Sequence, residues 1–147
     1  MAGWNILALT IAALFLKQVL VVLVQVVDRL RTKTLRHPED AKLLNASVGD
    51  SPLTERAQAV IRNSLENEAF FLFLLFALFS INADGQFRPH YEESEAAVVY
   101  ASVFVGARYA HALFFLLRVG GLRSLAFTAG LLAAVGVAVQ VVIGALA

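Results

Sequence analysis

Cysteine is absent from this chain of 147 residues. Its absence excludes disulfide bonds, a thiolate nucleophile and thiolate metal ligands. Charge is also scarce, because charged residues make up 16% of the sequence and hydrophobic residues 59%. That balance leaves too little charge for the surface of a small soluble domain. The formal net charge is only +1, so we expect neither a nucleic-acid partner nor, from the residue types present, a metal site.

Proline is rare as well, and its three occurrences, Pro38, Pro52 and Pro89, all lie in polar stretches. Four long, mostly apolar segments lie around them, over residues 4–31, 53–81, 95–117 and 122–146. About 20 mostly apolar residues are enough for a helix to cross a bilayer. The sequence therefore predicts an all-α integral membrane protein, a bundle of four transmembrane helices formed by a single domain over residues 1–147.

Lysine and arginine are distributed unevenly over the three linkers. The first linker, Thr32 to Pro52, and the third, Arg118 to Leu122, carry most of them together with their flanks, whereas the second, Asn82 to Ser94, holds only Arg88. The positive-inside rule then predicts that linkers one and three are cytoplasmic and that both termini lie outside. In a bacterium the membrane would be the inner membrane, and in a eukaryote the endoplasmic reticulum.

Ionisable residues interrupt two of the apolar segments. Arg62, Asn63 and Glu66 lie in the second segment, and Arg108 and His111 lie in the third. Residues three or four apart share one face of a helix, which places Arg62 beside Glu66 and Arg108 beside His111. Charged groups are costly in hydrocarbon and normally face a bundle interior or a watery cavity, so these residues indicate a functional site.

Each of these groups also has a structural interpretation that the sequence leaves open. Arg62 and Glu66 can form an ion pair within their own helix. Arg108 can pair with Glu66 or Glu68 and serve only to join two helices, because buried charges are usually paired. His111 can be a hydrogen-bonded residue of the bundle rather than a ligand.

The polar first half of the second segment needs shielding from lipid. Its fully apolar part, Ala69 to Ile81, is too short to span a bilayer. In the fourth segment Ala126, Gly130 and Ala134 recur at four-residue spacing and form a small face for close packing with neighbours. We therefore expect a homo-oligomer with the site at a subunit boundary. Lys17, a lone cation in the first segment, has no role that the sequence indicates.

Several polar residues are expected at the cytoplasmic ends of the helices. They are Arg29, Arg31, Arg62, Asn63, Glu66, His111 and Arg123. Arginine binds carboxylates in a two-pronged geometry, and a glutamate can bind an ammonium group. A small ligand with two carboxylates and an ammonium group fits this set; glutathione is such a ligand, and so are other zwitterions.

Four motifs in the chain resemble those of the MAPEG family, the membrane-associated proteins of eicosanoid and glutathione metabolism. In chain order the motifs are Pro38-Glu39-Asp40-Ala41, then Glu55-Arg56 with Arg62-Asn63 and Glu66-Asn67, then Phe104-Val105-Gly106-Ala107-Arg108-Tyr109-Ala110-His111, then Arg123-Ser124-Leu125-Ala126-Phe127. The third motif is most similar to the microsomal glutathione transferase branch. The resemblance covers nearly the whole chain in order.

The resemblance implies a homotrimer that binds glutathione as co-substrate between neighbouring subunits, near the cytoplasmic face. The implied glutathione ligands are Arg29, Arg62, Asn63, Glu66, Arg108 and His111. Arg123 would stabilise the glutathione thiolate, with Ser124 adjacent to the thiol. The second substrate would be a hydrophobic electrophile or a lipid that reaches the site from the membrane.

Two positions depart from the synthase branches of the family, because Phe115 and Phe127 stand where those branches carry tyrosines. A general glutathione transferase, with reduction of lipid hydroperoxides as a side activity, therefore fits better than specialised eicosanoid synthesis. The alternatives are an eicosanoid-type synthase, a non-catalytic lipid-binding scaffold of the same family and, outside the family, a small oligomeric transporter.

Overall fold

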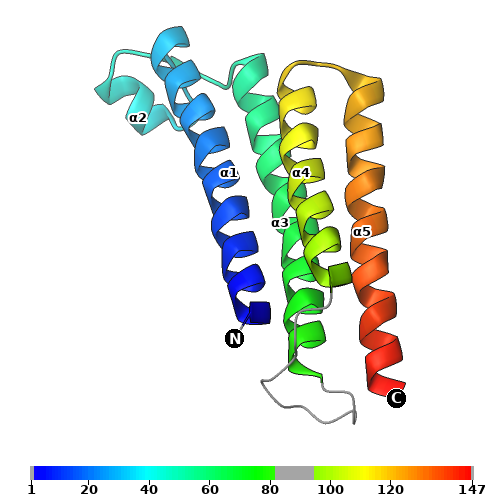
Figure 1. Ribbon diagram of the computed structural model, residues 1–147. Coiled ribbons are helices and arrows are strands. Elements are labelled where there is room, and N and C mark those ends of the chain that lie inside the picture. The colour runs from blue at the N-terminus through cyan, green and yellow to red at the C-terminus, as the bar shows by residue number, and fades with distance from the viewer. Residues whose placement is uncertain (1, 82–94, 147) are drawn as a thin grey trace.

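Four long helices lie side by side in the computed structural model, which describes residues 2–81 and 95–146 (Figure 1). They are α1 (Ala2–Thr32), α3 (Pro52–Ser80), α4 (Glu95–Leu116) and α5 (Gly120–Leu146). The limits expected from hydropathy differ from these bounds by at most two residues. The second linker, 82–94, on which part of the expected topology rests, lies outside the described residues.

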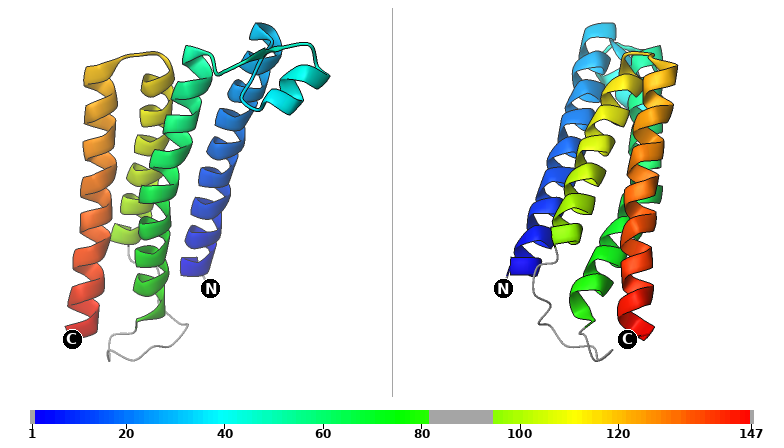
Figure 2. Two further views of the ribbon diagram at one scale, coloured as in Figure 1. Left: turned by 180° about the vertical axis from the view of Figure 1, so that it is seen from behind. Right: turned by 45° about the vertical axis from the view of Figure 1, so that its right-hand side comes forward.

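The helices alternate in direction along the bundle. The connection from α1 to α3 and the turn from α4 to α5 meet at one end, and both chain termini lie toward the other (Figures 1 and 2). We call the first of these the linker end: it is formed by the last turns of α1 and α4 and the first turns of α3 and α5. Because the helices alternate in direction, the halves of the helices nearer the linker end carry Arg29, Asn63, His111 and Arg123.

Three helices are long and apolar enough to cross a membrane: Trp4–Thr32, Glu95–Leu116 and Gly120–Leu146. The shortest has 22 residues, which at 1.5 Å per residue spans about 33 Å, the thickness of a bilayer core. Leucine and phenylalanine side chains cover the outside of the bundle; Leu9 is 70% exposed and Phe73 72%. Exposed apolar surface of this extent suits lipid rather than water, so the protein is membrane-embedded.

Helix α3 matches the others in length, with 29 residues, but is not among the three apolar spans. The physical reason is its polar first half, which the sequence already shows. Only the second half, which contains Phe71, Leu75 and Phe79, contributes large buried apolar side chains to the main core. Within the described residues the structure therefore has three candidate membrane spans, where the sequence predicted four.

The start of α3 is fixed to the end of α1 by capping interactions. The Ser51 hydroxyl accepts a hydrogen bond from the Thr54 amide at 3.1 Å, and Pro52 occupies the first helical turn. Asp28 of α1 accepts hydrogen bonds from the hydroxyls of Ser51 and Thr54. These contacts set the position of α3 relative to α1 at the linker end.

The first linker has more structure than its composition predicted. Strands β1 (Thr34–Leu35) and β2 (Ser47–Val48) form a short parallel pair, and α2 (Pro38–Leu43) lies between them in sequence. Pro38 at the first position and the two acidic residues after it favour helix initiation there. In Figure 1 this small unit lies beside the last turns of α1, away from the rest of the bundle.

The small residues of α5 pack against α4 of the same chain. Gly130 packs against Ala107: an added Cβ would lie 3.5 Å from the alanine methyl, at ordinary van der Waals contact. At Gly136 the same atom would lie 2.5 Å from the Tyr100 ring, which leaves no room for a side chain. Part of the small-residue face expected to meet neighbouring subunits is therefore used within one subunit, because the tight turn before α5 places it directly against α4.

Candidate functional site

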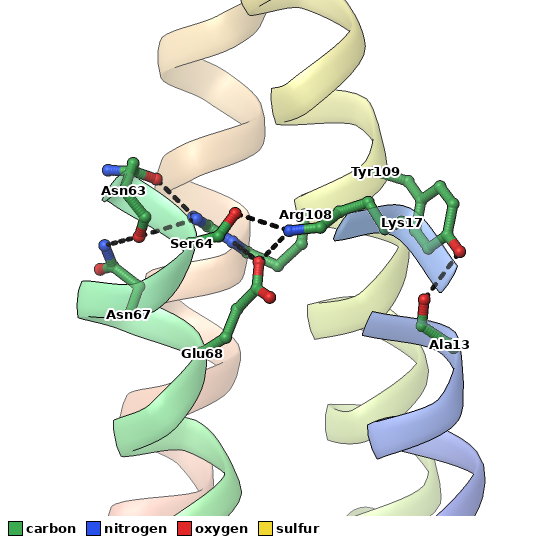
Figure 3. A network of polar contacts seen from close by, with 8 residues as sticks. All are labelled: Ala13, Lys17, Asn63, Ser64, Asn67, Glu68, Arg108 and Tyr109. Carbon is green, nitrogen blue, oxygen red and sulfur yellow. Dashed lines mark hydrogen bonds and ion pairs between the residues drawn. The ribbon is translucent and has the colours of Figure 1, made fainter. Parts of the chain in front are cut away.

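Lys17 lies on α1 at the middle of the bundle and is only 2% exposed. Its ammonium group donates hydrogen bonds to the Ser64 hydroxyl, at 2.6 Å, and to the Glu68 carboxylate (Figure 3). Both partners lie on α3, one turn apart. A cation that the sequence left unexplained thus joins the first two long helices through a buried ion pair.

Arg108 of α4 binds the same carboxylate from the other side. Its Nε lies 3.3 Å from Glu68 Oε1, the oxygen that also accepts from Lys17. Its Nη2 donates to the side-chain oxygen of Asn63 at 2.5 Å and to the Asn63 carbonyl at 3.3 Å. We call Lys17, Glu68 and Arg108 the buried charge cluster; it connects three helices and includes two cations and one carboxylate.

The cluster bears on two expectations from the sequence. Arg108, proposed as a glutathione ligand, pairs with Glu68, which was the structural alternative, and is 3% exposed. Lys17 and Glu68 were not among the candidate site residues. A partial signal existed, because Lys17 is the one charged residue in the middle of the first apolar segment and is expected to pair with a carboxylate, but the sequence does not decide between Glu66 and Glu68.

His111 and Arg123 meet at the linker end. His111 Nδ1 lies 3.2 Å from the Arg123 carbonyl oxygen, and the histidine is 5% exposed. A carbonyl oxygen only accepts hydrogen bonds, so Nδ1 carries a proton and the neutral ring offers Nε2 as an acceptor. Nε2 is buried and has no hydrogen-bond partner in the described part of the chain.

The phenylalanines that replace the family tyrosines surround this pair. The rings of Phe115 and Phe127 each lie 5.8 Å from the His111 ring. The Arg123 guanidinium carbon lies 4.8 Å from the centre of the Phe115 ring, a cation–π geometry. The two rings therefore form an apolar wall beside a positive charge, and they supply no hydroxyl.

Ser124, the second candidate catalytic residue, is exposed in the first turn of α5. Its hydroxyl donates to the Gly120 carbonyl of the same helix at 3.2 Å. The lone pairs of the hydroxyl remain available, and the helix N-terminus adds a partial positive charge at this point. Arg123 and Ser124 are thus adjacent on the chain at the positively polarised end of α5.

Arg62 and Glu66 are exposed on the outer face of α3. Within residues 2–81 and 95–146, the ion pairs are Lys17–Glu68, Arg29–Asp50 and Arg108–Glu68, and Arg62 and Glu66 do not pair with each other. The alternative interpretation as a private ion pair is therefore wrong for this structure. Two charges remain exposed on a helix whose neighbouring positions, such as Leu65, are apolar and exposed as well.

Arg29 contacts the first linker rather than the other candidate ligands. Its guanidinium lies 3.0 Å from Asp50, and Gln58 donates to the other oxygen of that carboxylate at 2.8 Å. Burial raises the pKa of Asp50, but the hydrogen bonds from Gln58 and Arg29 and the charges of Arg29 and Arg36 outweigh it, so the pKa lies below its ordinary value. Arg29 is thus partly engaged within its own chain.

The sequence model of the MAPEG family matches residues 7–143. The chain belongs to the MAPEG family. The family resemblance of the motifs is therefore confirmed. Comparison with curated protein sequences found no match, and comparison with solved structures found none either. Membership of MAPEG supports a membrane role of the glutathione transferase or eicosanoid synthase type; the family also includes non-catalytic members.

The MAPEG chain shows no group of three or more histidine, aspartate or glutamate side chains able to hold a metal ion within its described residues. At the linker end the fold brings together the Arg123 cation, the His111 imidazole and the rings of Phe115 and Phe127. Asn63, on the neighbouring helix α3, is held by Arg108 of α4. Such an arrangement can bind an anionic, peptide-like ligand and stabilise negative charge on it.

Proposed function

We propose that this MAPEG protein is a membrane-bound glutathione transferase that joins the glutathione thiolate to hydrophobic electrophiles, and that also reduces lipid hydroperoxides. The observation that carries the proposal is the contact of Arg123 with His111 and Phe115 at the positively polarised start of α5. It places a cation beside an apolar wall, which is what a thiolate and a lipid-soluble substrate together require.

Glutathione would bind through the polar face of α3. The guanidinium of Arg62 suits a carboxylate, the carboxylate of Glu66 suits the ammonium group, and Asn63 suits a carbonyl or carboxylate oxygen. Arg62 and Glu66 are exposed in a single chain and have no partner among its described residues, which supports completion of the site by a second subunit. We propose a homotrimer, with Arg29 and His111 as further ligands and Arg108 acting within its own chain.

The chemistry would begin with the thiol of bound glutathione. A free thiol of this kind has a pKa of about 8.5, so little of it is ionised at neutral pH. The charge of Arg123 and the N-terminus of α5 favour the thiolate, and Ser124 would donate a hydrogen bond to the sulfur once its hydroxyl turns away from the Gly120 carbonyl. The sulfur then forms a bond to the electrophilic carbon of the second substrate, and the leaving group departs with the electrons of its own bond.

In the membrane we propose that α3 spans together with the three apolar helices, because α1, α4 and α5 cover the inner face of its polar half and a neighbouring subunit would cover the exposed Arg62 and Glu66. Linkers one and three would be cytoplasmic, since eight of the basic residues lie at or next to the linker end. They are Arg29, Arg31, Lys33, Arg36, Lys42, Arg56, Arg118 and Arg123. The lysine and arginine bias is the physical basis for this orientation.

The test is a conjugation assay on the protein purified in detergent, with glutathione and a generic aryl halide. We expect turnover, together with a thiolate absorbance of bound glutathione near neutral pH. Native mass spectrometry of the same sample should show three chains. A protein that binds lipid but not glutathione would instead be a non-catalytic scaffold, and a stable, active monomer would contradict the shared site.

A further inference from the structure

The buried charge cluster contacts Asn63, a residue of the proposed glutathione site. Lys17 binds Glu68, Glu68 binds Arg108, and Arg108 binds Asn63. We propose that Lys17 and Glu68 are positioning residues: they hold Arg108 so that it orients the Asn63 side chain, which then presents its amide N–H groups to an oxygen of glutathione. The inference rests on the proposed function for the identity of the ligand. Its geometric part, the control of Asn63 by Lys17, stands on the contacts within one chain.

The orientation of Asn63 follows from the chemistry of its partner. A guanidinium has donors and no acceptor, so the atom that faces Arg108 Nη2 at 2.5 Å must be the side-chain oxygen. The amide nitrogen then points away from Arg108, as Figure 3 shows. The Asn63 backbone is also held, because its carbonyl accepts from Asn67 at 2.7 Å and from Arg108 at 3.3 Å. Asn63 therefore directs its N–H donors away from Arg108, where they can meet a ligand.

Lys17 is needed because Glu68 competes with Asn63 for the same guanidinium. An arginine beside a free carboxylate tends to form two parallel hydrogen bonds with it, and that geometry would withdraw Nη2 from Asn63. In the structure Lys17 binds Glu68 Oε1, and Arg108 reaches that oxygen only through Nε at 3.3 Å. Nη2 remains available for Asn63. Lys17 thus acts on the ligand site through two intermediates.

Charge balance indicates which variant keeps the fold. Removal of Lys17 leaves Glu68 and Arg108 as a neutral pair, so no unpaired buried charge results. Methionine fills the space of the lysine stem with a flexible apolar chain. Ser64, which loses its lysine partner, can donate to a carbonyl of its own helix. Lys17→Met is therefore expected to fold and to assemble.

Calorimetric titration with glutathione measures the effect. Lys17→Met should weaken glutathione binding about tenfold, as expected when one hydrogen bond to the ligand is lost. The double variant Lys17→Met/Glu68→Gln removes the competing carboxylate as well, so Arg108 returns to Asn63 and the affinity should recover most of that loss. A merely structural role predicts the opposite, since the second change would add to the damage. In the double variant Arg108 is a buried cation without an ion-pair partner, so unfolding is followed in parallel and affinities are compared only under conditions where the double variant is folded.

Two further measurements make the result specific. Thr10→Val, a buried α1 residue at 4% exposure that lies outside the cluster, should leave the affinity unchanged. In an Asn63→Ala background Lys17→Met should have no additional effect. The inference is overturned by wild-type affinity in Lys17→Met, by no recovery in the double variant, or by an equal loss in the Asn63→Ala background.

A second measurement, which needs no ligand, separates failure of this inference from failure of the proposed function. If the wild-type protein does not bind glutathione, the side-chain amide resonances of Asn63 in an NMR spectrum decide the positioning role without any ligand. They should shift in Lys17→Met and return in Lys17→Met/Glu68→Gln, with Thr10→Val as control. Unchanged Asn63 resonances in Lys17→Met would overturn the inference whatever the protein binds.

Discussion

Glu66 and Glu68 lie two residues apart on α3, yet one is exposed and the other is buried. Two positions along a helix correspond to a rotation of about 200°, so the two carboxylates point to nearly opposite sides. Glu68 faces inward, where Lys17 and Arg108 satisfy it within the chain. Glu66 faces outward with Arg62, where the described chain supplies no partner. The same residue type thus serves helix packing on one face and is left for a ligand or a neighbouring subunit on the other.

The largest effect is expected from removal of the inward carboxylate. Glu68→Leu leaves two buried cations without an anion, which should lower the free energy of unfolding by about 3–5 kcal/mol. Chemical or thermal unfolding in detergent measures it. The matched variant Glu66→Leu should unfold nearly as the wild type does. Equal losses in the two variants would show that the two faces of α3 do not differ as the structure indicates.

The next effect concerns the chemistry at the start of α5. Arg123→Ala should reduce turnover about 10²–10³-fold, as the loss of a charge-stabilising donor does in other active sites. The thiolate absorbance of bound glutathione should move to higher pH, and Arg123→Lys should recover part of the activity because the charge remains. Lys42→Ala, an exposed cation of α2, is the control. Full turnover in Arg123→Ala would assign thiol activation to another group.

A smaller effect is expected at the outward carboxylate. Glu66→Gln should weaken glutathione binding by about 1–3 kcal/mol, because a charge-assisted hydrogen bond to the ammonium group becomes a neutral one. The unfolding temperature should not change, in contrast to Glu68→Leu. Glu55→Gln, an exposed position in the first turn of the same helix, controls for loss of charge. Unaltered affinity in Glu66→Gln would mean that the outward face does not bind the ligand.

The smallest effect tests the contact between α1 and the first linker. The pKa of Asp50 is lowered in the folded protein, so the carboxylate stabilises the fold above its ordinary value of 3.8, and this contribution is lost as the pH falls through the lowered pKa. At neutral pH Asp50→Asn should lower the free energy of unfolding by less than about 1 kcal/mol, which thermal unfolding in detergent measures. The difference should disappear in acid, and a difference that persists at low pH would contradict this role of the Asp50 carboxylate.

The helices were predictable from sequence because hydropathy and length decide them. The four long apolar segments needed no knowledge of packing, and the motifs around Arg62, His111 and Arg123 were sufficient for the family. The linker unit was missed because two-residue strands and a six-residue helix leave no periodic pattern. The two strands pair with each other across α2, Thr34 opposite Ser47, so they depend on a contact between positions distant in sequence.

The partners of individual charges were not predictable to the same degree. The pairing of Lys17 with Glu68 depends on which faces of α1 and α3 meet, and that is settled by packing along the whole interface. The sequence offered Glu66 and Glu68 equally as partners of Arg108, and only the rotation of α3 about its axis distinguishes them. The position of Phe115 and Phe127 around His111 likewise depends on how α4 and α5 are joined.

Lys17 has a consequence for the order in which the chain enters the membrane. A lysine at the middle of an isolated spanning helix opposes insertion by about 2.5–3.5 kcal/mol. Its carboxylate partner lies 51 residues further along the chain and therefore reaches the bilayer later than α1 does. At roughly 5–20 residues per second, Glu68 follows after several seconds. During that interval α1 stays in the membrane through apolar side chains such as its leucines, valines and isoleucines, and Lys17 gains its ion-pair partner only when α3 has followed.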